Sequence, residues 1–128
     1  LSMQSTRPVF LDLWRIKLPA TGFVSILHRV SGVLMVLAIP VGAVLFDQAV
    51  SGPQGFAAAT ALLHHWLARL VLVLLAWSVI HHLFAGIRYL LLDLRIGLDR
   101  APARRSAWIV MVAAVLTLGL VLIWEVTA

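Results

Sequence analysis

The sequence contains no cysteine and only five aspartate or glutamate residues among 128. Without cysteine, the chain cannot form a disulfide, bind zinc or an iron–sulphur cluster through thiolates, or use a thiol nucleophile. Charged residues of both signs make up 12% of the chain, against about 25% in soluble domains. Five carboxylates are too few to cover a soluble globule of this length. These shortages argue against a soluble enzyme.

Apolar residues, in contrast, are abundant. They make up 62% of the chain, and the mean hydropathy is +1.05, so the chain is too apolar to remain solvated and disordered. The ten lysine and arginine residues give a net charge of +5. These basic residues flank apolar stretches and form no aromatic-interleaved stripe, so a lipid bilayer explains them better than a nucleic-acid partner. We therefore expect an all-α integral membrane protein.

Three apolar stretches predict three transmembrane helices within a single membrane-anchor domain, 1–128. The first covers about 22–46, and the third covers about 106–126 with a tryptophan near each end, as interfacial aromatic residues prefer. The second, about 57–94, would form a helix of about 57 Å, whereas the hydrocarbon core of a bilayer is about 30 Å thick. Its start is therefore predicted to lie at the outer interface; this part contains His64, His65, Trp66 and Arg69.

The basic residues also predict the orientation. The leader, 1–21, and the segment 88–105 carry eight of them, namely Arg7, Arg15, Lys17, Arg88, Arg95, Arg100, Arg104 and Arg105. The loop 47–56 carries none. By the positive-inside rule, the leader and the second loop lie in the cytoplasm, so the N-terminus is cytoplasmic. We expect a multi-pass protein of the bacterial inner membrane, with the mitochondrial inner membrane as the alternative.

Polar residues within the predicted spans indicate a functional or packing role, because burying them in lipid is costly in free energy. Helical offsets place one group on a single face of the first span: Ser25, His28, Arg29 and Gly32. Ser31 points away from this face and is interpreted as a packing residue. A face of the second span carries His82, Gly86, Tyr89 and Asp93, and His81 and Arg88 share a neighbouring face.

The depths of two histidines suggest a cofactor. His28 lies about 9 Å and His82 about 18 Å from the cytoplasmic ends of their helices. This layout would suit a metal centre deep in the bundle with an anionic edge toward the cytoplasm, and a b-type haem is such a group. Gly86, one turn from His82, would leave room for a flat ring.

Two motifs resemble those of the cytochrome b subunit of succinate dehydrogenase, a membrane anchor of respiratory complex II. The first is S-I-L-H-R-V-S-G at 25–32, preceded by Arg7-Pro8 and Leu11-Asp12-Leu13. The second is H-L-F-A-G-I-R at 82–88, followed by Asp93. The resemblance covers about 7–125. Tyr89 departs from the family pattern, which more often has histidine there, so a propionate or hydrogen-bonding role at this position does not carry over.

The resemblance implies a role for four residues. His82 would be an axial ligand of haem b, His28 and Arg29 would lie at the haem propionates, and Ser25 and Arg29 would line a site for ubiquinone or menaquinone. It also implies a second hydrophobic anchor subunit, which supplies the other axial histidine, together with an iron–sulphur subunit and a flavoprotein subunit that carry out the succinate chemistry. No independent catalysis is expected from this chain.

Plainer interpretations stand beside these. His82 could form only a helix–helix hydrogen bond, Arg29 could snorkel to lipid headgroups, and Ser25 could bond to its own helix. His81 competes with His82, and only the spacing to Gly86 and Arg88 selects His82; His81 itself is interpreted as packed against a partner helix. Arg88 either pairs with Asp93 or meets the iron–sulphur subunit, and His64 and His65 lie at a solvated surface.

Two classes of function remain. One is the redox anchor just described, including a fumarate reductase anchor or a haem-free relative. The other is a non-redox membrane protein, such as a transporter or an assembly subunit. The outer half of the first span, 33–46, is entirely apolar, so the polar residues form a dead-ended pocket. Such a pocket suits a quinone site better than a channel.

Overall fold

The computed structural model describes residues 17–127, which form four helices. Their bounds are α1 Ala20–Val50, α2 Pro53–His64, α3 Trp66–Asp93 and α4 Arg100–Thr127. Helices α1, α3 and α4 are long and apolar enough to cross a membrane. With 28 residues each, α3 and α4 are about 42 Å long, which matches a bilayer with its headgroups. The prediction of an all-α membrane protein with three spans is confirmed.

The predicted leader falls largely outside the described residues. Arg7, Pro8, the segment Leu11-Asp12-Leu13 and Arg15 lie there. Of the leader's three basic residues, only Lys17 is described, and it is exposed. Helix α1 begins directly after Pro19, whose backbone is extended. It continues to Val50, beyond the predicted end at residue 46, because nothing in 47–50 interrupts the helix before the turn at Gly52.

The predicted second stretch, 57–94, consists of two helices with a corner at His65. The backbone of His65 is extended, and its Nδ1 accepts a hydrogen bond of 3.3 Å from the N–H of Leu67. His65 therefore caps the N-terminus of α3. Helix α2 begins at Pro53, because proline suits the first helical position, and Gly52 before it has φ 138°, which only glycine adopts readily.

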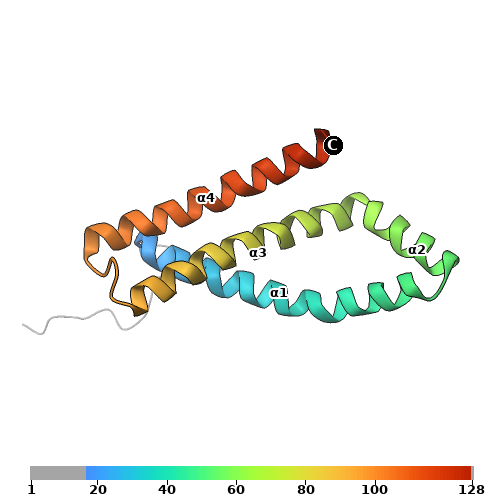
Figure 1. The fold of residues 1–128 in the computed structure, drawn as a ribbon, viewed down its shortest axis with the longest axis horizontal. Helices are drawn as coiled ribbons and strands as arrows, with labels where there is room; N and C mark the ends of the chain where they lie inside the picture. The colour runs from blue at the N-terminus through green and yellow to red at the C-terminus, as the bar shows by residue number, and fades with distance from the viewer. Residues whose placement is uncertain (1–16, 128) are drawn as a thin grey trace, which may run out of the picture.

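The helices meet most closely at one end of the bundle (Figure 1). Helix α3 is central: α1 crosses one side of it, and α4 packs along another. The small core at this end consists of Val24 from α1, Ala85 from α3, and Ala107 and Val110 from α4. We call this the basic end, because Arg95 of the α3–α4 loop and the arginines at the start of α4 lie here. Toward α2, at the opposite end, α1 and α3 separate (Figure 1).

Most large apolar side chains lie on the outside of the bundle. Val44 of α1 and Leu116 of α4, for example, are 68% and 62% exposed. An apolar surface this extensive is incompatible with water but matches a bilayer or apolar protein neighbours. Among the described residues, the buried ones are valines, alanines and polar residues, so most of the apolar surface is left for lipid or other proteins to cover.

The end of α3 directs the chain into the loop that carries the basic residues. Arg95 has φ 62°, the left-handed conformation that often ends a helix. Its N–H donates to the carbonyl of Leu92, and the N–H of Ile96 donates to the carbonyl of Leu91. These two bonds satisfy carbonyls that the helix would otherwise leave unpaired, and they turn the chain toward α4.

Candidate functional site

Polar side chains of α1 and α3 meet between these helices, toward the basic end. The rings of His28 and His82 stack with centroids 4.0 Å apart and planes inclined by 16°. The Tyr89 ring lies 5.2 Å from that of His28. Ser31, which is fully buried, completes the group. We call these four residues the imidazole cluster. The sequence analysis placed His28 on one face of the first span, and His82 and Tyr89 together on one face of the second.

Hydrogen bonds determine which nitrogen of His82 carries the proton. The Ser31 hydroxyl donates its hydrogen to the carbonyl oxygen of His28 over 2.8 Å. The Nδ1 atom of His82 lies 3.2 Å from Ser31 Oγ and 3.1 Å from the same carbonyl. Since both neighbouring oxygens act as acceptors, Nδ1 must be the donor, and a neutral imidazole has only one. The lone pair is therefore on Nε2, which makes no hydrogen bond within residues 17–127.

This arrangement is the one that metal-binding histidines adopt. Such a histidine usually donates its second ring N–H to a carbonyl or carboxylate, which fixes the ring's orientation and raises the basicity of the ligating nitrogen. Here the carbonyl of His28 and the hydroxyl of Ser31 provide that support for His82. Sequence reasoning treated Ser31 as a packing residue and missed this contact. The available signal was its offset of three residues from His28, which places the two on adjacent surfaces of the helix.

His81 and His82 differ in their accessibility. The His81 side chain is 1% exposed and stacks on Trp77 of its own helix, with ring centroids 5.1 Å apart. A bulky cofactor cannot reach His81 without displacing the helices around it. His82 is only partly buried within the chain. The structure therefore favours His82 as the histidine available to a ligand from outside.

Two polar atoms of the imidazole cluster are buried without a hydrogen-bond partner among the described residues. They are Nε2 of His28 and the hydroxyl oxygen of Tyr89. Leaving such a group unpaired costs about 1–3 kcal/mol. An anionic ligand that reached these two atoms would give both a hydrogen-bond partner. The cluster therefore fits a group that has a metal and acidic substituents.

Glycine at position 32 allows α1 to approach the His82 ring. A Cβ atom added to Gly32 would lie 3.1 Å from Cε1 of His82, which is tighter than an ordinary contact. The sequence suggested that Gly86 leaves room for a flat ring. In the structure, the ring nearest to Gly86 is that of His28, and a Cβ there would lie 3.8 Å from its Nε2.

Ser25 and Arg29 lie on α1 beside the cluster but do not join it. Ser25 is half-buried and Arg29 is exposed. Within residues 17–127, neither side chain makes a hydrogen bond, and Arg29 has no ion pair. In contrast, the hydroxyl of Ser78 bonds back to a carbonyl of its own helix. The groups predicted to serve a quinone are thus available to a ligand.

Arg88 connects α3 to α4. Its side chain is 6% exposed, its Nε donates to Ser106 Oγ over 2.9 Å, and its Nη2 donates to the carbonyl of Ala103 over 3.1 Å. The suggested ion pair with Asp93 is wrong, because Asp93 is exposed and the guanidinium turns toward α4. The Arg88 side chain can be buried because two of its nitrogens donate hydrogen bonds to oxygens of α4.

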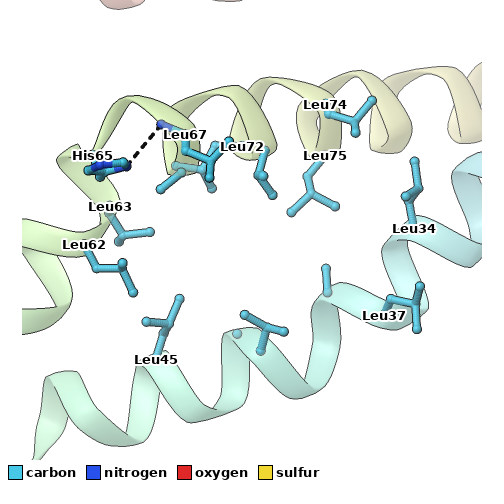
Figure 2. Close-up of a pocket in the computed structure, with 15 residues that line it drawn as sticks. Leu34, Leu37, Leu45, Leu62, Leu63, His65, Leu67, Leu72, Leu74 and Leu75 are labelled. Atoms are coloured by element: carbon cyan, nitrogen blue, oxygen red, sulfur yellow. Dashed lines mark hydrogen bonds between the residues drawn. The ribbon is translucent and has the colours of Figure 1, made fainter.

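A second, apolar pocket lies toward the opposite end, between α1 and the α2–α3 corner (Figure 2). Its volume is about 530 Å³, and leucines from both sides line most of it. His65 is the one polar residue in the lining, and its ring already accepts the hydrogen bond that caps α3. Apart from the Nε2–H of His65, this pocket offers no polar group to a ligand, whereas the imidazole cluster offers several.

Comparisons with known proteins agree with each other. A family model described as succinate dehydrogenase/fumarate reductase transmembrane subunit matches residues 3–122. The succinate dehydrogenase cytochrome b556 subunit of Coxiella burnetii (strain RSA 493 / Nine Mile phase I) is 34% identical over 124 residues, covering 95% of this chain and 98% of the relative. The protein of the same name from Paracoccus denitrificans is 30% identical over 120 residues, covering 94% and 92%.

Proposed function

The chain belongs to the succinate dehydrogenase/fumarate reductase transmembrane subunit family, and on this premise we propose that it is the cytochrome b anchor subunit of a succinate dehydrogenase. It holds a b-type haem together with a second hydrophobic anchor subunit. It also forms part of the site where quinone is reduced by electrons from succinate, which arrive through the flavoprotein and iron–sulphur subunits. The observation that carries this proposal is the half-buried His82, whose Nδ1 is committed to α1 and whose Nε2 is left to bind iron.

Different residues of the chain would contact different parts of the haem. His82 Nε2 would bind the haem iron, together with a histidine of the second anchor subunit. His28 and Arg29 meet the propionates, which would satisfy the unpaired Nε2 of His28. The buried Tyr89 hydroxyl lies on the same side and can donate a hydrogen bond. When bound, the haem takes up and releases one electron at a time within the membrane.

Ser25 and Arg29 bind and orient the quinone. The Ser25 hydroxyl donates a hydrogen bond to a quinone carbonyl, and the Arg29 guanidinium organises the pocket from its rim. Both hydrogen bonds would strengthen as negative charge develops on the carbonyl oxygen.

The proposed orientation places the basic end in the cytoplasm of a bacterium, with the chain spanning the inner membrane three times. Arg95 of the α3–α4 loop and the three arginines at the start of α4 support this assignment through the positive-inside rule. In this orientation, the imidazole cluster and Arg29 lie in the cytoplasmic half of the membrane. That half is the one that faces the subunits oxidising succinate.

The division of labour between subunits can be tested with Ser25→Ala. A complex isolated through this chain should oxidise succinate with a soluble dye as acceptor, and Ser25→Ala should leave that rate unchanged while lowering quinone reduction. The reason is that this chain has no cysteine to hold a cluster and its sequence contains no flavin-binding motif. The measurement is the ratio of quinone-linked to dye-linked turnover in the assembled complex. Selective loss of the dye-linked rate would contradict the proposal.

Gly32→Ala tests the support of the haem ligand. The added methyl group would press on Cε1 of His82, so the ring must tilt and its Nδ1 bonds must lengthen. We expect a shifted haem absorbance or a lowered haem content per complex. Gly42→Ala is the matched control, because it lies on the same helix and its Cβ would meet nothing within 4 Å. Identical spectra for the two variants would refute this role of Gly32.

A further inference from the structure

The first turns of α4 carry an unusual concentration of positive charge. Arg100, Arg104 and Trp108 follow one another at four-residue intervals, and Arg105 lies beside them. With Ala101 they line a shallow hollow of about 530 Å³. We call these three arginines and Trp108 the arginine patch. It is separate from the imidazole cluster, which α1 and α3 form.

The arginines of the patch are exposed at the start of α4. The side of α4 that packs against the other helices is marked by Ala107, Val110 and Ala114, all buried, whereas the three arginines are exposed. Within residues 17–127, none of the three guanidinium groups forms a hydrogen bond or an ion pair, and Asp99, next to Arg100, pairs with none of them. Three permanent charges thus lack a counter-charge in the described part of the chain.

The chemistry changes along α4 from the patch into the membrane. Trp108 lies one helical turn further along α4 than Arg104, a distance of about 6 Å. This distance is about the thickness of one headgroup region of a bilayer. Its side chain is 54% exposed. Beyond it, the exposed surface of α4 is apolar, with Val112 and Val115 at 51% and 63% exposure. The order along the helix is therefore cationic, then amphipathic aromatic, then apolar.

We propose that the arginine patch binds the headgroup of an anionic phospholipid from the leaflet at the basic end. Guanidinium groups form paired hydrogen bonds with phosphate oxygens, and the Trp108 indole lies at the level where headgroup and acyl chains meet. The acyl chains then lie along the apolar surface below. An acidic protein would match only the arginines, and a partner membrane helix would match only the apolar part. A phospholipid matches all three zones.

The test is a lipid titration of the intact complex, isolated through this chain and stripped of lipid in neutral detergent. Native mass spectrometry would measure the binding of phosphatidylglycerol and of phosphatidylcholine with the same acyl chains. We expect phosphatidylglycerol to bind more tightly. Arg104→Gln should weaken that binding about fivefold, and the triple variant with Arg100→Gln and Arg105→Gln about a hundredfold. Binding of phosphatidylcholine should change little.

Controls separate this proposal from its competitors. Arg69→Gln removes an exposed arginine near the opposite end and should leave phosphatidylglycerol binding unchanged. Since Arg104 is exposed, its single variant should assemble even if the triple variant does not. Unchanged lipid affinity in Arg104→Gln would overturn the proposal, as would loss of the water-soluble subunits from that variant with lipid binding intact. Full competition by inorganic phosphate at the lipid's concentration would indicate a free-anion site instead and would also overturn it.

Discussion

Replacing His82 with alanine is expected to abolish the haem absorbance of the assembled complex. The Nδ1 atom of this residue is held by the His28 carbonyl and the Ser31 hydroxyl, at 3.1 and 3.2 Å, so only Nε2 can reach iron. The neighbouring His81 cannot substitute, because it is enclosed within the chain. His82→Tyr should also remove or grossly perturb the signal. A phenol ring has no nitrogen that could form the hydrogen bonds by which Nδ1 holds the imidazole in place. The measurement is the absorbance of reduced and oxidised samples, normalised to assembled complex.

His81→Ala is the control for this experiment. It removes the neighbouring imidazole, which stacks on Trp77, and it should leave the haem spectrum largely intact in the complexes that assemble. Loss of haem from His81→Ala with retention in His82→Ala would reverse the assignment. Turnover is the poorer readout, because electrons could pass from a nearby cluster to the quinone without the haem.

Arg29→Leu is expected to lower quinone reduction by on the order of 10²-fold, the usual cost of removing one hydrogen-bond donor directed at a developing oxyanion. Arg29 is exposed beside the cluster, and within residues 17–127 no acidic group neutralises it. Its planar guanidinium can serve a propionate and the quinone pocket at once. Arg29→Lys keeps the charge but loses the paired donors, so it should be impaired less than Arg29→Leu. Quinone-linked turnover at matched dye-linked activity is the measurement.

The plainer alternative for Arg29 is that it only reaches for lipid headgroups. In that case any long basic side chain would suffice, and Arg29→Lys would retain near-normal quinone reductase activity in a haem-replete complex. Arg69→Lys, at an exposed arginine near the opposite end, makes the same change away from the site. It should be indistinguishable from the unaltered protein.

The three spans were predictable from the sequence because the length and continuity of apolar stretches reflect the thickness of the bilayer. The family was also predictable, and the comparisons confirm it: two short motifs at fixed spacing carried the resemblance. The corner at His65 was not predictable, since neither proline nor glycine marks it. Its extended backbone is stabilised by a side-chain cap, which a hydropathy pattern does not reveal.

Contacts between helices limited how much of the site could be predicted from the sequence. Helical periodicity correctly grouped His28 with Gly32, and His82 with Tyr89, because it depends only on residues of one helix. It could not show that Ser31 supports His82, because that contact depends on the crossing of α1 and α3. It also left open the partner of Arg88, which proved to be α4. Helical periodicity indicates which residues share a face of one helix, whereas the packing of the helices determines which faces are in contact.

The most direct test of the central claim is a reduced-minus-oxidised difference spectrum of the membrane complex isolated through this chain, with succinate as the reductant. The structure leaves the lone pair of one imidazole, His82 Nε2, directed away from its supporting hydrogen bonds, and the proposed function requires that it bind haem iron. We expect the absorbance bands of a low-spin b-type haem, in proportion to the amount of this chain. A fully assembled complex that reduces quinone and shows no haem absorbance would contradict the account.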